Sequence, residues 1–179
     1  MPQLSTILKY LDFQIAVSLA ALLAAWKWSD WKNWKKYYST ILYYIIISFL
    51  YAMLTYNHPL WEFKSPLLKT TFSDILLGFV CSPALILLYL TFYPHGLLQQ
   101  VPYLLLWVLV SAVVELTSFY LGFISFQNGW SIWWSTFFYL IMFIALRLHY
   151  QKPLWAWVIS VPIVTFFLVY FKVPLSSMK

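Results

Sequence analysis

The chain has 179 residues, of which 63% are hydrophobic and only 9% are charged. A water-soluble domain carries about a quarter charged residues, so this composition excludes a protein whose whole surface faces water. The net charge of +6 comes from lysines and arginines that stand between long apolar segments. This placement favours contact with anionic lipid over nucleic acid as a partner. The single cysteine, Cys81, excludes an intramolecular disulfide.

Six apolar segments follow one another, and each is long enough to cross a bilayer as a helix that rises about 1.5 Å per residue. They predict an all-α fold, a polytopic bundle of about six membrane-spanning helices that forms a single transmembrane domain over residues 1–179. The expected helices cover residues 4–26, 37–56, 71–92, 101–122, 130–146 and 154–171. Pro83 and Pro162 predict kinks, and the kink at Pro83 is tolerable where neighbouring helices or Ser82 satisfy the freed backbone groups.

The loop after the first segment alternates lysine with tryptophan. Such residues are typical of a membrane–water interface, where lysines meet lipid phosphates and tryptophans lie at headgroup depth. The basic segment after the fifth helix is expected on the same side, because every second loop of a multi-spanning protein lies there. The residues expected to contact headgroups are Lys27, Lys32, Lys35, Lys36, Trp31, Trp34, Arg147 and Lys152. The lysine cluster predicts that loops 27–36 and 147–152 are cytoplasmic and that the protein is multi-pass in the cell membrane.

A few polar side chains form a candidate buried polar site. His58 and Glu62 share one loop and could act as an acid–base pair, but one His and one Glu are too few for a standard metal site. Asp74 falls in the first turn of the third expected helix, where the helix dipole favours a carboxylate. Asn128 begins a turn with Gly129. No metal, cofactor or catalytic residue is predicted.

Glu115 is the one acid placed deep inside a long apolar segment. An ionised carboxylate without a cation at that depth would be costly, so we expect Glu115 to face the bundle and to be protonated or hydrogen-bonded. The polar groups nearest in depth are Asp74 and Asn128. Two interpretations remain open, a structural hydrogen bond between helices and a functional site.

Several strings of residues resemble a family of small, uncharacterised integral membrane proteins of Gram-positive, largely spore-forming bacteria. The strings are residues 30–38, 56–63, 128–130 and 147–149, with Lys152 and Pro153. The resemblance covers nearly the whole chain, and it implies source and membrane location rather than a chemistry. One departure is Ser39, where the family more often has proline.

The sequence contains no phosphate-binding loop, no dinucleotide glycine pattern and no zinc-protease or serine-hydrolase motif. We therefore expect a non-catalytic membrane protein that binds lipid, an apolar ligand or a partner, which could be a second copy of the chain or another membrane protein. An alternative is a small transporter or proton-linked carrier that uses Glu115. A second alternative is a membrane enzyme that acts at the side of His58 and Glu62.

Overall fold

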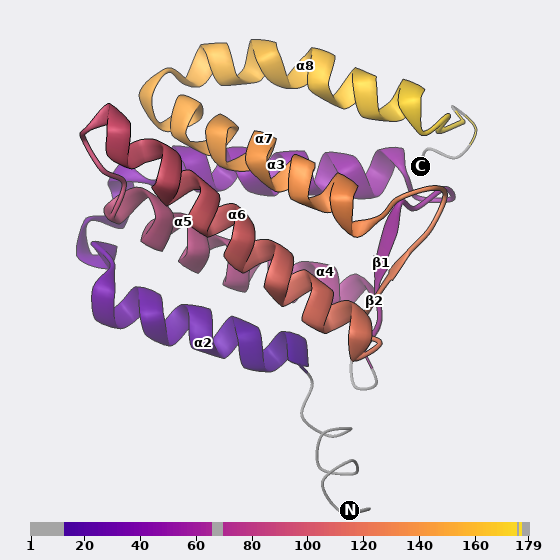
Figure 1. Cartoon of the computed structure of the whole chain (residues 1–179), viewed down its shortest axis with the longest axis horizontal. Coiled ribbons are helices and arrows are strands. Elements are labelled where there is room, and N and C mark those ends of the chain that lie inside the picture. The colour runs from indigo at the N-terminus through magenta and orange to yellow at the C-terminus, as the bar shows by residue number, and fades with distance from the viewer. Residues whose placement is uncertain (1–12, 66–69, 175, 177–179) are drawn as a thin grey trace, which may run out of the picture.

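The computed structural model describes residues 13–65, 70–174 and 176, so the expected helical residues 4–12 lie outside the described residues. The helices run back and forth between two ends of the molecule (Figure 1). One end carries a small two-stranded sheet and is called the hairpin end, formed by residues 55–65 and 121–131. The opposite end is called the basic end, formed by residues 29–37, 92–96 and Lys152.

The lysine–tryptophan loop at the basic end is folded rather than open. Helix α2 (Phe13–Trp28) is followed by a short 3-10 helix (Trp31–Lys36) and then by α3 (Tyr38–Leu54). The Asp30 carboxylate accepts a hydrogen bond from Asn33 Nδ2 at 2.7 Å and one from Lys36 Nζ at 3.3 Å. The bond from Asn33, together with that from Lys36 and the attraction of its charge, holds the pKa of Asp30 below its usual range.

The third apolar segment is one helical run in three parts. It consists of α4 (Thr70–Leu76), a π-helical turn (Leu77–Cys81) and α5 (Ser82–Thr91). Pro83 has no N–H to continue the α-helical pattern, and Ser82 Oγ donates to the Leu77 carbonyl at 2.8 Å. The irregularity expected at Pro83 takes the form of a π-helical turn. The Ser82 hydroxyl bonds to the Leu77 carbonyl, which also accepts from the Ser82 N–H, and not to a carbonyl that Pro83 leaves free.

Three long helices complete the bundle: α6 (Leu97–Tyr120), α7 (Ile132–Gln151) and α8 (Pro153–Tyr170). Helix α6 begins four residues before the predicted start, because the N–H groups of Gln99 and Gln100 bond to the Gly96 carbonyl and start the helix there.

The predicted end of α7 at residue 146 was wrong, and residues 147–151 form its last turns instead of a loop. Only Lys152 connects α7 to α8. It leaves the helical conformation, with φ −142° and ψ 75°, because the following Pro153 clashes with a helical residue before it. Basic side chains do not end a helix by themselves.

The two-stranded sheet was not predicted. Strands β1 (Trp61–Phe63) and β2 (Ile124–Phe126) pair antiparallel, with Glu62 opposite Ser125. Two further backbone bonds flank the pair, from Gln127 N to the Leu60 carbonyl and from Lys64 N to the Phe123 carbonyl, both at 2.8 Å. The sheet joins the α3–α4 and α6–α7 connections and closes the hairpin end (Figure 1).

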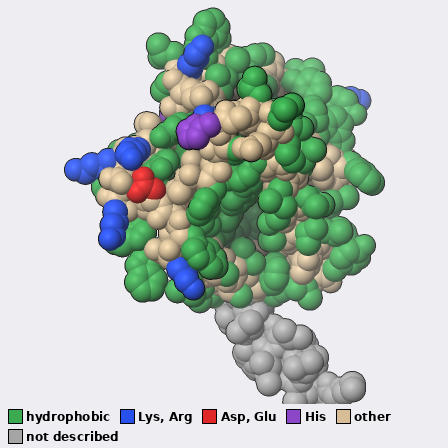
Figure 2. Space-filling model, turned by 60° about the vertical axis from the view of Figure 1, so that its left-hand side comes forward, with side chains coloured by type: hydrophobic (Ala, Val, Ile, Leu, Met, Phe, Trp, Pro, Cys, Tyr) green, Lys and Arg blue, Asp and Glu red, His purple; other side chains and the backbone are tan. Residues whose placement is uncertain are grey.

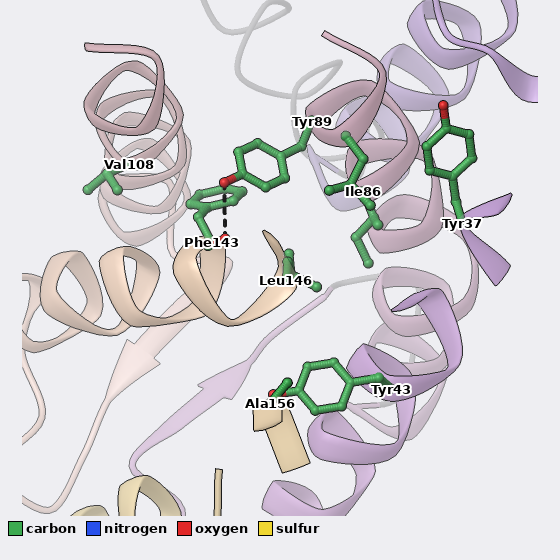
Figure 3. Close-up of a cluster of buried hydrophobic side chains, with 9 residues drawn as sticks. Tyr37, Tyr43, Ile86, Tyr89, Val108, Phe143, Leu146 and Ala156 are labelled. Atoms are coloured by element: carbon green, nitrogen blue, oxygen red, sulfur yellow. Dashed lines mark hydrogen bonds between the residues drawn. The ribbon is translucent and has the colours of Figure 1, made fainter. Parts of the chain in front are cut away.

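Two kinds of packing hold the helices together. The largest buried cluster surrounds Tyr89, which is 0% exposed and whose hydroxyl donates to the Phe143 carbonyl at 3.0 Å (Figure 3). Helices α2 and α5 instead meet through small buried residues, which let two backbones approach closely inside a membrane. These residues are Ala21, Ala25, Cys81 and Ala84. Cys81 is therefore a packing residue.

Four helical runs are long and apolar enough to cross a membrane, judged by length and composition alone: Phe72–Thr91, Leu97–Tyr120, Ile132–Gln151 and Pro153–Tyr170. Helices α2 and α3 are also apolar but have 16 and 17 residues. Hydrophobic side chains cover most of the face shown in Figure 2. The described structure is thus an all-α bundle with one small sheet, and its composition and helix lengths fit a membrane protein.

Candidate functional site

Glu115 faces the interior of the bundle, as predicted. Its side chain lies on α6 and is 8% exposed. Ser135 Oγ, on α7, donates a hydrogen bond to Glu115 Oε1 at 2.7 Å, and Trp130 Nε1 donates to Ser135 Oγ at 2.8 Å. A chain of two hydrogen bonds therefore runs from the Trp130 indole through Ser135 to the Glu115 carboxyl group, and it links α6 to α7.

The turn between β2 and α7 positions both partners of Glu115. Asn128 and Gly129 have positive φ angles of 50° and 85°, which these two residue types adopt at little cost, and this confirms the predicted turn. The turn places Trp130 two residues before the start of α7. Ser135 lies in the first turn of α7, with its N–H bonded to the Ser131 carbonyl at 3.0 Å. The hydroxyl of Ser135 is thereby held at the depth of Glu115.

One oxygen of the carboxyl group is left without a hydrogen bond. Glu115 Oε2 is buried and has no hydrogen-bond partner among the described residues. The Tyr139 hydroxyl lies close enough to interact with the carboxyl group, one helical turn beyond Ser135. A buried charge without a cation is costly, so this geometry suits a neutral acid whose Oε1 accepts from Ser135.

The other candidate polar residues gather at the hairpin end. Gln127 Nε2 donates to Glu62 Oε2 at 3.1 Å, and the exposed Asn128 donates from Nδ2 to the Pro59 carbonyl at 2.7 Å. These two bonds fasten the α6–α7 connection to the α3–α4 connection. His58 is half-buried, and its Nε2 atom has no partner among the described residues.

Asp74 does not cap a helix. It is half-buried on α4, which begins at Thr70, so Asp74 lies beyond the first turn where the sequence had placed it. Its carboxyl group is within electrostatic range of that of Glu62. The hydrogen bonds of Glu115 run to α7 and include none of the other four candidates. No group of three or more His, Cys, Asp or Glu side chains that could hold a metal ion occurs in the described part of the chain.

The residues expected to meet lipid headgroups divide into two sets. The first set is exposed and consists of Lys27, Lys152 and the 3-10 helix Trp31–Lys36. Lys and Arg side chains gather at one side of the face in Figure 2. Arg147 is instead half-buried on α7. Its guanidinium lies over the Tyr93 ring at 4.1 Å, a cation–π contact that fixes the side chain against the protein.

A second buried polar group was missed by the sequence reasoning. His149, assigned there to a loop, is 3% exposed on α7, and its Nδ1 atom lies 3.1 Å from Thr40 Oγ1 on α3. Its ring stacks on Tyr43 at 4.3 Å, and the Tyr43 hydroxyl is 2.6 Å from Ser160 Oγ on α8. The signal was present, because His149 continues the three-residue spacing of the buried Phe143 and Leu146.

Two substitutions of Glu115 test its structural role. We expect Glu115→Gln to retain the fold, because an amide oxygen accepts from Ser135 as the acid does. Glu115→Leu should lower the free energy of unfolding by about 1–3 kcal/mol, because it leaves the buried Ser135 hydroxyl without its acceptor. Thermal unfolding in one detergent measures both, with the exposed Val113→Leu on the same helix as control. A Leu variant as stable as the wild type would contradict the structural role.

Comparison of the chain with models of known protein families, with curated protein sequences and with solved structures finds no match in any of the three.

Proposed function

We propose that the chain is an integral membrane protein that crosses the bilayer six times and acts without catalysis, by binding lipid or a membrane partner. The observation that carries this proposal is the apolar outer surface on helices of spanning length. In the most apolar part of α6, only 6% of the residues are buried inside the molecule. Exposed apolar side chains on a helix of this length require lipid or another protein around them.

Two observations support six crossings instead of four. The shorter helices α2 and α3 lie alongside the longer ones and run between the same two ends (Figure 1). A helix slightly shorter than the hydrocarbon layer is accommodated by local thinning of the bilayer and by interfacial residues at its ends. Trp26 and Trp28 at the end of α2 and Tyr38 at the start of α3 are exposed and suited to this role.

The same proposal places the basic end in the cytoplasm of a bacterial cell, and the resemblance of residues 56–63 and 147–149 to bacterial membrane proteins supports the source. In a Cys81→Ala background, Gln151→Cys should resist an impermeant thiol reagent added outside intact cells. Asn57→Cys, in the exposed loop at the hairpin end, should react readily. Permeabilised cells, in which both must react, provide the control. Ready labelling of Gln151→Cys from outside would reverse the orientation.

Native mass spectrometry of the detergent-purified protein tests the binding function. We expect the chain to retain lipid molecules, a second copy or a partner after mild delipidation. Alkaline extraction of membranes provides the companion measurement, in which a spanning protein stays in the pellet. Release of the chain by alkali, or its detection only as a monomer without bound lipid or partner under all mild conditions, would refute the proposal.

One observation favours a second function, a proton-linked carrier. Glu115 Oε2 has no hydrogen-bond partner in the described part of the chain and lies in the bundle interior, where a carboxyl group can exchange a proton while transport occurs. Flux into proteoliposomes should then respond to a proton gradient in the wild type and lose that response in Glu115→Gln. Equal proton and solute leak in both would remove this function and leave the binding function untouched.

A further inference from the structure

An apolar groove runs between α2 and the third apolar segment, on the side of the basic end. Its volume is about 340 Å³, and it opens toward the space that lipid would occupy. Its rim is formed by large side chains from α2, from the 3-10 helix and from the π-helical turn with α5. Among them are Leu22, Trp26, Trp31, Phe79, Pro83 and Leu87.

The local backbone explains why a groove forms here. Ala25 and Ala84, both buried, line it as well, so the two helices meet closely at its floor and spread at its rim. The π-helical turn adds a residue to the turn before Pro83 and presents Phe79 and Val80 to the groove. Single π-helical turns of this kind often mark functional positions. The result is an open apolar groove whose lining includes the aromatic residues Trp26, Trp31 and Phe79.

The charges beside the groove are not balanced within the protein. Four lysines lie in residues 27–36, and Lys36 pairs with Asp30 at 3.3 Å. Lys27, Lys32 and Lys35 are exposed and form no ion pair among the described residues. Lys27 directly follows Trp26, and Lys32 directly follows Trp31, both of which line the groove. Two cationic residues are therefore each one position along the chain from a tryptophan that lines the groove, and the Lys27 ammonium lies 5.3 Å from the centre of the Trp28 ring.

We propose that this groove is a specific binding site for an anionic phospholipid. One acyl chain lies between α2 and α5, and the phosphate lies at Lys27 and Lys32. An acyl chain suits the apolar lining, and an anionic headgroup complements unpaired lysines beside tryptophans. A second groove, about 510 Å³ on α8, is lined by one helix alone and so offers only one wall to a chain. This inference rests on the proposed lipid-binding function and names its ligand.

Lipid titration by native mass spectrometry tests the proposed lipid-binding site. The delipidated protein is titrated with phosphatidylglycerol and with phosphatidylcholine of the same acyl chains. We expect the wild type to prefer phosphatidylglycerol. Lys27→Gln and Lys32→Gln should each lower its affinity about fivefold and leave phosphatidylcholine unaffected, which is the effect of one lysine near anionic lipid. Leu22→Trp should lower the affinity for both lipids, because the larger ring fills the groove.

Matched controls exist on the same elements. Lys152→Gln removes an exposed lysine at the same end, and Leu19→Trp adds a ring to an exposed position of α2 that does not line the groove. Neither should change lipid binding, and thermal unfolding should show that every variant is folded. Free inorganic phosphate should not compete.

Three outcomes would contradict the proposed lipid-binding site: equal affinity of the wild type for both lipids, an equal loss of phosphatidylglycerol affinity in Lys152→Gln and Lys27→Gln, or competition by free phosphate. In each of these cases the protein still binds lipid, so the proposed function stands. A chain that retains no lipid of either kind and no partner would refute the proposed function itself.

Discussion

Replacing Trp130 by alanine is expected to lower the free energy of unfolding by about 3 kcal/mol, since deletion of a large buried ring leaves a cavity that neighbours fill only in part. The Trp130 ring lies 4.8 Å from that of Trp61 on β1 and 5.1 Å from that of Phe171 after α8. It therefore joins the sheet, the start of α7 and the end of α8 in one cluster. The loss should fall at the low end for aromatic side chains, because lipid already offers apolar surroundings to the unfolded chain.

The indole N–H adds a second effect that a matched variant isolates. Trp130→Phe keeps most of the ring but removes the donor to Ser135, so it should cost about 1 kcal/mol, the value of one net hydrogen bond. Trp133→Ala, at a position that is 80% exposed, is the control and should be nearly neutral. Thermal and denaturant unfolding in one detergent give all three values. Equal stability of Trp130→Ala and Trp133→Ala would show that the aromatic cluster does not hold the hairpin end.

Replacing Tyr89 by alanine should have an effect of similar size, about 3 kcal/mol, for the same reason. Tyr89 is 0% exposed and lies in the largest buried cluster, with its ring 4.9 Å from that of Phe143 (Figure 3). Its ring also lies 5.7 Å from that of Tyr103. Its hydroxyl donates to α7, and its carbonyl accepts from the Tyr103 hydroxyl at 2.8 Å. Its removal opens a cavity where α5, α6 and α7 meet.

Tyr89→Phe separates packing from hydrogen bonding at this position. It leaves the ring in place, and the Phe143 carbonyl that loses the tyrosine hydroxyl lies within α7, so we expect a cost of only about 1 kcal/mol. Tyr120→Ala, at a site that is 78% exposed, serves as the control. Unfolding of the three variants in one detergent is the measurement. A Phe variant as unstable as the Ala variant would mean that the hydrogen bond, and not the ring, holds the three helices.

Local sequence signals predicted the helices well where the length of the apolar segment agrees with the residues that flank it. Helices α3 and α8 match their expected bounds to within two residues, because loops with proline or charge flank each segment. The same signals misplaced the start of α6 and the end of α7. The end of α7 was misplaced because charged residues look like a loop, whereas the break comes only where Pro153 constrains Lys152.

The candidate site shows the same division between local and distant information. The burial of Glu115 was predictable, because a lone acid in an apolar helix must turn away from lipid. Its partner was not, since the choice of Ser135 over Asp74 or Asn128 depends on how far α6 and α7 slide past each other. His149 was overlooked for a related reason: a histidine near a basic segment appears exposed until the helix is seen to continue through it.

By itself, then, the sequence determined the class of protein, the order of the apolar helices, the turn at Asn128 and the inward position of Glu115. All of these follow from the properties of residues that are neighbours along the chain. Only the tertiary structure decided that β1 pairs with β2, that Trp130 and Ser135 reach Glu115, and that a groove opens between α2 and α5. These contacts join segments far apart in sequence, and their geometry depends on the packing of whole helices, which no local pattern encodes.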